Sequence, residues 1–169
     1  MWQLLESPER KNTRRLFTAA MRRSHNLPVK EGYVEDPISV DWARRNLPDT
    51  IGYFIEHRDG FRTAMFLANI QDFNYAGLRR DTGEIISCQM YLPMPTHSAT
   101  TADFFNPLIR HIETMVLENR APYPVERTLL TSGMTLAAVD SIYKGHTVVE
   151  TPEMRVVYQG PQESTFWRA

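Results

Sequence analysis

Four polar side chains near the middle of the chain are of types that bind or react with small molecules: Asn69, Asp72, Tyr91 and His97. A carboxylate and a phenol can exchange protons with a substrate, and amide and carboxylate groups bind sugar-like hydroxyls. Tyr91 and His97 are therefore candidate catalytic residues, and Asn69 and Asp72 are candidate substrate-binding residues. The alternatives are that His97 only fills a polar loop and that Asn69 and Asp72 form a turn, which we favour for Asp72.

The remaining reactive residues do not form a recognisable constellation. The five histidines lack the His-x-x-x-His and His-Glu-x-x-His spacings of metal sites. Ser132 and Ser141 lack the glycine elbow that exposes a nucleophile. No G-x-G-x-x-G motif follows a strand, so we expect this chain alone to bind neither a metal nor a nucleotide cofactor.

Bulk composition limits the partners and the compartment. Nineteen Lys and Arg residues against 20 Asp and Glu residues give a net charge of −1, which disfavours nucleic acid as a partner. No apolar run approaches the roughly 18 to 20 residues that cross a bilayer, so we expect no membrane insertion. The single cysteine, Cys88, cannot pair within the chain, and its apolar neighbours predict a reduced, partly buried thiol in a cytoplasmic protein.

Start signals, stop signals and turns mark the elements that must position these side chains. Ser7-Pro8-Glu9 begins a predicted helix that runs to about residue 24, because a hydroxyl cap and a first-turn proline favour helix initiation. Strand-like runs joined at Arg58-Asp59-Gly60 and at Asp81-Thr82-Gly83 predict two β-hairpins in one antiparallel meander. The other expected elements are a short helix at 39–45, helices at 107–119 and 124–143, and an extended segment at 146–158 that joins the sheet.

Two helices carry distinctive patterns. In residues 124–143, Gly133, Ala137 and Ser141 fall four residues apart, and this seam of small side chains predicts close packing against a helix or sheet. In residues 1–30, seven Lys and Arg residues stand against two Glu residues, a local charge of +5. We interpret that basic run as a solvated helix face; the alternative is a surface that binds phosphate or an acidic partner.

These patterns predict an α+β fold: an open, mainly antiparallel β-sheet with helices packed on one face, plus an N-terminal helical segment. The expected division is residues 1–47 for the helix and connecting segment and residues 48–169 for the sheet and its helices. The predicted strand from Phe61 to Ile70 is apolar on both faces, so the sheet needs cover on both sides. The second layer must come from the N-terminal segment, another copy or another chain.

The order of elements from residue 51 to 158 resembles the C-terminal sheet domain of the Gfo/Idh/MocA (glucose-fructose oxidoreductase / inositol dehydrogenase) superfamily. The most specific segments are PYPVERTLLTSG at 122–133 and VVETPEMRVVY at 148–158. The resemblance implies an open sheet whose uncovered face makes oligomer contacts, and an NAD(P)-binding Rossmann domain that is missing from this sequence. The superfamily's lysine-proline motif and its upstream Asp/His helix are also missing, so no catalytic residue can be transferred.

Three functions are consistent with these features. The first is the substrate-side and oligomerisation domain of a Gfo/Idh/MocA-like oxidoreductase, which a separate Rossmann partner would complete with NAD(P). The second is a noncatalytic homo-oligomeric assembly module. The third is a small-ligand binding protein without a nucleotide cofactor. In the first two, a second copy or a Rossmann partner docks on the exposed sheet face.

Overall fold

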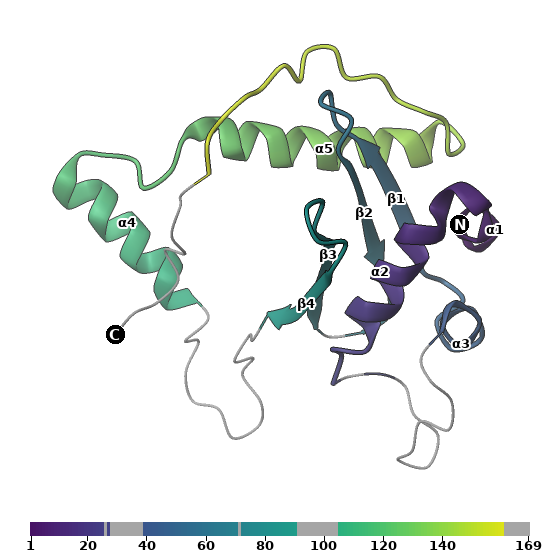
Figure 1. Cartoon of the computed structure of the whole chain (residues 1–169). Helices are drawn as coiled ribbons and strands as arrows, with labels where there is room; N and C mark the ends of the chain where they lie inside the picture. Colours follow the sequence, from purple (N-terminus) through teal and green to yellow (C-terminus); the bar gives the residue numbers. More distant parts are fainter. Residues whose placement is uncertain (26, 28–38, 71, 91–104, 161–169) are drawn as a thin grey trace. The chain divides into compact units, whose positions relative to one another are not determined.

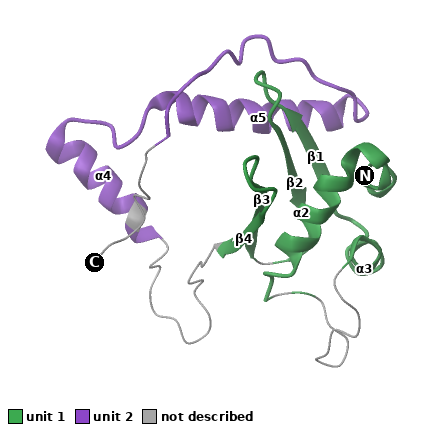
Figure 2. Cartoon of the chain, in the orientation of Figure 1, with its two compact units in different colours: residues 1–92 green, residues 93–169 purple. Residues whose placement is uncertain are grey.

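The fold is α+β with an N-terminal helical segment, as predicted (Figure 1). The structure is a computed structural model that describes residues 1–25, 27, 39–70, 72–90 and 105–160. The chain forms two units, Met1–Leu92 and Pro93–Ala169 (Figure 2). Residues 1–47 and both hairpins therefore share one unit.

The first unit contains the N-terminal helices and all four strands. Its elements in chain order are α1 (Trp2–Glu6), a 3-10 turn η1 (Pro8–Arg10), α2 (Lys11–Met21), α3 (Val40–Asn46), β1 (Ile51–Glu56), β2 (Arg62–Leu67), β3 (Phe73–Leu78) and β4 (Ile85–Met90). The predicted helix at 8–24 is thus a 3-10 turn followed by α2. The short helix expected at 39–45 is confirmed as α3, whose start is capped by the Ser39 side chain accepting from the Trp42 N–H at 3.1 Å.

Both predicted hairpins are present. β1 pairs antiparallel with β2, and β3 pairs antiparallel with β4. Gly60 and Gly83 have φ values of +78° and +69°, the left-handed conformation that the turn glycines were expected to supply. The glycines therefore close both turns in the predicted register.

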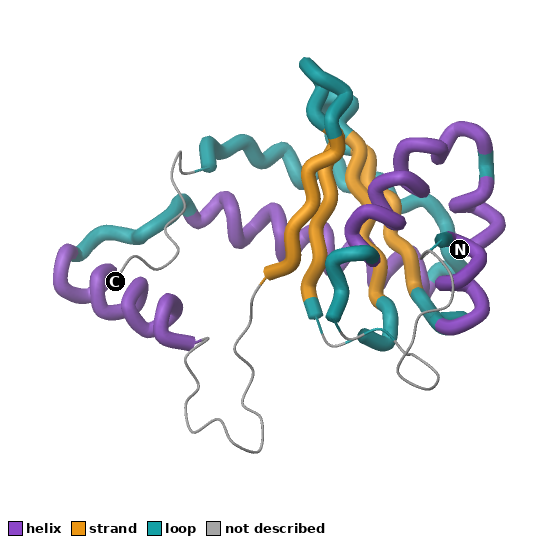
Figure 3. Tube along the Cα trace, turned by 60° about the horizontal axis from the view of Figure 1, so that its bottom comes forward, coloured by secondary structure: helices purple, strands orange, loops and turns teal. Residues whose placement is uncertain are grey.

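The hairpins form two separate two-stranded sheets and not one hydrogen-bonded meander among the described residues. At the junction between them the Ile70 N–H donates to the Ala68 carbonyl at 2.8 Å, so the chain turns on itself. The Ile70 N–H is therefore not available for a hydrogen bond between neighbouring strands. The strands of both hairpins still run alongside one another next to the N-terminal helices (Figure 3).

The buried core lies between the N-terminal helices and the hairpins. The buried apolar side chains among the described residues are Leu5, Phe17, Met21, Trp42, Ala43 and Leu47. The Phe17 ring of α2 lies 4.8 Å from the Phe66 ring of β2 and 6.1 Å from the Trp2 ring of α1, both edge to face. Phe17 thus joins one hairpin to two helices.

Each hairpin turns one face toward these helices and leaves the other face exposed. Strand alternation places Gly52, Phe54 and Phe66 on the covered face, where a Cβ at Gly52 would lie 2.6 Å from Met1 Cγ. In β3 and β4 the covered face includes Asn74, Ser87 and Gln89, which contact or approach α2 and the residues after it. On the opposite face six large apolar side chains are 42% to 62% exposed: Ile51, Met65, Leu67, Phe73, Tyr75 and Ile86.

The second unit contains α4 (Asn106–Glu118), α5 (Val125–Tyr143) and an irregular C-terminal segment. α4 is closed by Asn119, which follows its last residue and has a left-handed backbone (φ 48°). α5 ends before Gly145, at φ +79°. None of the side chains described in residues 105–160 is buried, and none of the described helices is long and apolar enough to span a membrane.

The prediction that the segment at 146–158 joins the sheet is wrong, because residues 147–160 form no strand. The segment returns along α5, because the Ser141 hydroxyl donates to the Thr147 carbonyl at 2.6 Å and the Met154 thioether lies against Gly133. The Met154 N–H bonds back to the Thr151 carbonyl across Pro152, which forms a local turn. The predicted seam of small residues is therefore covered by this segment and not by a sheet.

Replacing Phe17 with Ala is expected to lower the free energy of unfolding by about 3 to 5 kcal/mol, since a buried aromatic ring is lost and a cavity remains. The matched control is Phe61→Ala, because Phe61 is 46% exposed. Urea unfolding followed by tryptophan fluorescence measures both. Equal losses for the two variants would contradict the placement of the core.

Replacing Gly133 with Ala is expected to displace Met154 and to loosen the segment after it, because the new methyl group would occupy the position of the thioether. Trypsin should then cleave after the exposed Arg155 several-fold faster than in the unmodified protein, as opening becomes easier. Ser132→Ala, on the adjacent exposed position of α5, is the control and should leave the cleavage rate unchanged. An unchanged rate in Gly133→Ala would show that the segment does not depend on this contact.

Candidate functional site

Asp72 lies directly before β3 at the centre of a polar cluster. Its Oδ2 accepts hydrogen bonds from the Ser24 hydroxyl at 2.7 Å, the His25 N–H at 3.1 Å and the Gln89 side chain at 3.0 Å. Its Oδ1 accepts from the Asn74 amide at 2.6 Å. The cluster therefore joins the residues after α2 to both strands of the second hairpin.

This geometry gives Asp72 a clear structural role. Four donors match the roughly four lone-pair positions of a carboxylate, so few positions remain for a substrate hydroxyl. Hydrogen bonds to a charged acceptor are stronger than neutral ones, and they hold the end of α2 against the hairpin. This role differs from the turn-forming alternative weighed for Asp72, because the partners come from distant parts of the sequence.

The other predicted site residues do not join this cluster in the part of the chain that the structure describes. Asn69 lies at an exposed bend between the hairpins, and its side chain takes no part in the bonds to Asp72. Tyr91 and His97 lie outside the described residues. The structure therefore assembles no acid/base pair from these four candidates within its described ranges.

Several members of the cluster were not anticipated from the sequence. Asn74 and Gln89 are directly opposite each other in the β3–β4 register. Alternation of polar and apolar residues along both strands is a signal that could have placed these two amides on one face. Ser24 and His25 carry no such signal, because they reach Asp72 across more than 45 residues of sequence.

The described histidines and the single cysteine do not form a metal or nucleophile site. No group of three or more His, Cys, Asp or Glu residues that could hold a metal occurs within the described ranges. His57 Nε2 lies 3.1 Å from the Thr63 hydroxyl, and the His111 ring lies 6.4 Å from the Tyr123 ring. Cys88 is exposed, which corrects the expectation of a partly buried thiol, because it lies on the uncovered face of β4.

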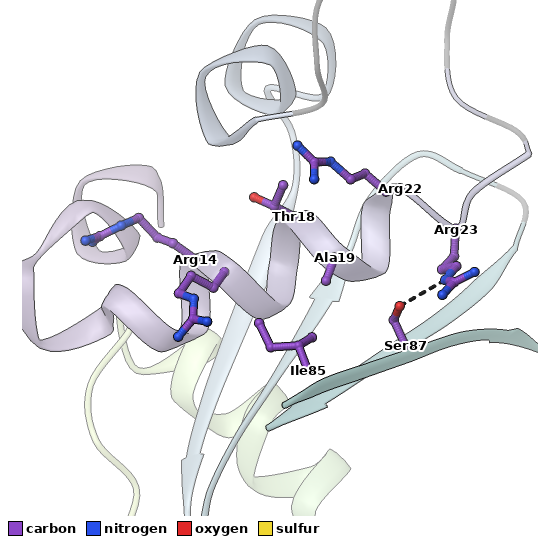
Figure 4. Close-up of a pocket in the computed structure, with 8 residues that line it drawn as sticks. Arg14, Thr18, Ala19, Arg22, Arg23, Ile85 and Ser87 are labelled. Atoms are coloured by element: carbon purple, nitrogen blue, oxygen red, sulfur yellow. Dashed lines mark hydrogen bonds between the residues drawn. The ribbon is translucent and has the colours of Figure 1, made fainter. Parts of the chain in front are cut away.

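A second candidate site is an open groove between α2 and β4, with a volume of about 720 Å³ (Figure 4). Its lining residues are Arg14, Arg15, Thr18, Ala19, Arg22, Arg23, Ile85 and Ser87. None of them is acidic or aromatic. Arg23 Nε donates to the Ser87 hydroxyl at 2.9 Å, and Arg14 donates to the Leu5 and Ser7 carbonyls at 2.9 and 2.6 Å.

Some arginines elsewhere in the first unit are paired with carboxylates. At the β3–β4 turn, two hydrogen bonds from the Arg79 guanidinium lower the pKa of the Asp81 carboxyl below its usual range. Arg44 pairs with Glu6 and Asp41, and Arg62 pairs with Glu56. Within the described residues, no carboxylate lies within ion-pair distance of the four groove arginines.

Replacing Asp72 with Asn is expected to destabilise the protein by about 1.5 to 3 kcal/mol, since charge-assisted hydrogen bonds are lost and an amide donor faces other donors. Asp49→Asn is the control, because Asp49 is exposed and should change stability by less than about 0.5 kcal/mol. Urea unfolding at neutral pH measures both variants. A loss in Asp72→Asn no larger than in the control would contradict the structural role.

Comparison with protein-family models, with curated proteins and with solved structures gave no match for this chain. The resemblance of residues 51–158 to the Gfo/Idh/MocA sheet domain therefore rests on the sequence segments alone. The geometry of the hairpins, the Asp72 cluster and the arginine groove provides independent grounds for inferring function.

Proposed function

We propose that this chain is the substrate-side and assembly domain of a Gfo/Idh/MocA-like oxidoreductase, and that it pairs with a second copy of itself through the uncovered face of its hairpins. The observation that carries the proposal is the row of exposed apolar side chains on that face. The sequence resemblance supplies the oxidoreductase class. In this proposal a separate Rossmann partner brings NAD(P), because this chain has no glycine-rich dinucleotide loop.

The distribution of polar and apolar side chains over the two faces of the β3–β4 hairpin is the reverse of the usual one. The face toward α2 is rich in polar groups such as Asn74 and Gln89, whereas the exposed face carries Phe73, Tyr75 and Ile86. Antiparallel sheets with one solvated face normally place polar residues on that face. Large contiguous apolar patches on a soluble protein mark interaction sites.

A second copy is the occupant that fits this surface best. Alternation places no charged residue of β1 to β4 on the exposed face: Glu56 and Arg62 are opposite each other on the covered face. Two identical uncharged surfaces can meet about a two-fold axis without like-charge repulsion. Interfaces between permanently associated copies are also the most hydrophobic class. A noncatalytic assembly module would use the same interface. Cofactor chemistry, and not self-association, therefore distinguishes the oxidoreductase domain from the assembly module.

Replacing Phe73 with Glu is expected to abolish self-association, because a charge would be buried without a partner. The control is Val116→Glu on α4, where the side chain is 70% exposed and lies outside the proposed interface. Light scattering after size-exclusion chromatography should give a dimer or larger assembly for the unmodified protein and the control, and a monomer for Phe73→Glu. A monomeric unmodified protein at micromolar concentration would contradict the proposed association.

Cys88 provides a second measurement on the same face. It is the only cysteine of the chain and is exposed in the single chain. Its reaction with a thiol reagent should be slow in the assembly and should accelerate on dilution or in Phe73→Glu. Equal rates at all concentrations would place the interface elsewhere.

The oxidoreductase part of the proposal has its own test. The chain alone should show no rise in melting temperature with NAD(H), and a co-purified Rossmann-domain partner should restore NAD(H) binding. NAD(H) binding by the chain alone would contradict the assignment of the cofactor site to another polypeptide.

A further inference from the structure

The groove between α2 and β4 has two positively charged ends and a neutral middle. Arg14 and Arg15 stand at one end, and Arg22 and Arg23 stand at the other. Arg22 follows Arg14 by eight positions, as Arg23 follows Arg15, which corresponds to about 12 Å along the helix axis. The middle is formed by short or apolar side chains, Thr18, Ala19 and Ile85, which leave room for a ligand (Figure 4).

Each end combines one fixed guanidinium with one that has unused donors. Arg14 is held by the Leu5 and Ser7 carbonyls, and Arg23 is held by the Ser87 hydroxyl. Arg15 makes only a 3.4 Å contact with Asn12, and Arg22 makes no side-chain hydrogen bond within the described residues. A guanidinium that is already positioned loses less conformational entropy when an anion binds.

We propose that this groove binds a small molecule with an anionic group at each end, of the class of a bisphosphate in which a neutral carbon framework separates the two phosphates. Arginine forks match phosphate oxygens in bidentate geometry, so an arginine at each end of the groove can hold one phosphate. The Thr18 and Ser87 hydroxyls can bind hydroxyl groups of the framework, and Ala19 and Ile85 contact its carbon atoms. The groove volume lies within the range of small-molecule sites.

The observations favour a small bisphosphate over nucleic acid. Proteins that bind single-stranded nucleic acid stack bases on aromatic side chains, and no aromatic residue lines this groove. The net charge of the whole chain is −1, which gives no overall attraction for a polyanion such as nucleic acid. The proposal does not depend on the oxidoreductase assignment, because it uses α2 and β4 alone.

The experiment is calorimetric titration of the full chain with fructose 1,6-bisphosphate, fructose 6-phosphate and inorganic phosphate as probes. The bisphosphate should bind at least about tenfold more tightly than either monophosphate, since only it can engage both arginine pairs. Its affinity should fall about tenfold or more in the double variant Arg15→Gln/Arg22→Gln, whose replaced side chains are exposed and make no strong contact. Arg58→Gln/Arg80→Gln, at exposed positions near the tips of the two hairpins, removes the same two positive charges outside the groove, and this control should bind as the unmodified protein does.

Three results would overturn the proposal. Equal affinity for the bisphosphate and inorganic phosphate would show general charge attraction, and unchanged binding in the double variant would place the anion elsewhere. Tighter binding of a single-stranded oligonucleotide than of the bisphosphate would identify a nucleic-acid surface. Circular dichroism of each variant confirms that a lost signal is not lost folding. If a Rossmann-domain partner did not restore NAD(H) binding, or if the chain did not self-associate, the bisphosphate results would be unaffected. The two proposals therefore fail separately.

Discussion

The packing of α2 against one face of both hairpins is the interaction on which the rest of the structure depends. Phe17 joins β2 to the N-terminal helices, and the Asp72 cluster fixes the other end of α2 to the second hairpin. All of the buried apolar residues of the described chain lie in this unit. A hairpin alone is marginal in water, so this single helical layer supplies the tertiary packing that both hairpins need.

The same packing creates the surfaces to which we assign function. Since α2 covers only one face, the opposite face presents Phe73, Tyr75 and Ile86 to solvent. Since α2 is amphipathic, its arginines come to lie beside β4, where Ser87 holds Arg23. One short helix therefore determines both the uncovered apolar surface and the charged groove. The helix α5 of the second unit likewise has no buried residue, which is consistent with a chain that completes its packing in an assembly.

Local signals in the sequence predicted local structure well. Gly60 and Gly83 were placed correctly in turns because a positive φ angle is strongly tied to residue type. The segment at 146–158 was wrongly assigned to the sheet. Alternation of side chains indicates that a segment has two different faces, but it does not show whether a neighbouring strand pairs with its backbone. The small-residue seam of α5 predicted close packing without revealing that Met154 would fill the space at Gly133.

Features that need distant residues were beyond sequence reasoning. Asp72 was recognised as a polar residue at a junction, but its partners Ser24 and Gln89 come from a helix end and a later strand. The arginines in and directly after α2 could be recognised in the sequence as a basic run. That they lie beside β4 could be learned only from the tertiary structure. Charge patterns thus located the groove only in part, since its second wall lies 60 residues or more away in sequence.

The most direct test of the central claim is methyl NMR with a soluble paramagnetic probe, which broadens the signals of solvent-exposed methyl groups. We expect that, at high protein concentration, the methyl groups of Ile51, Leu67 and Ile86 are protected while those of Val148, which is 88% exposed, are broadened. Equal broadening of all four residues at every concentration would show that water covers the hairpin face in solution, and would contradict the account.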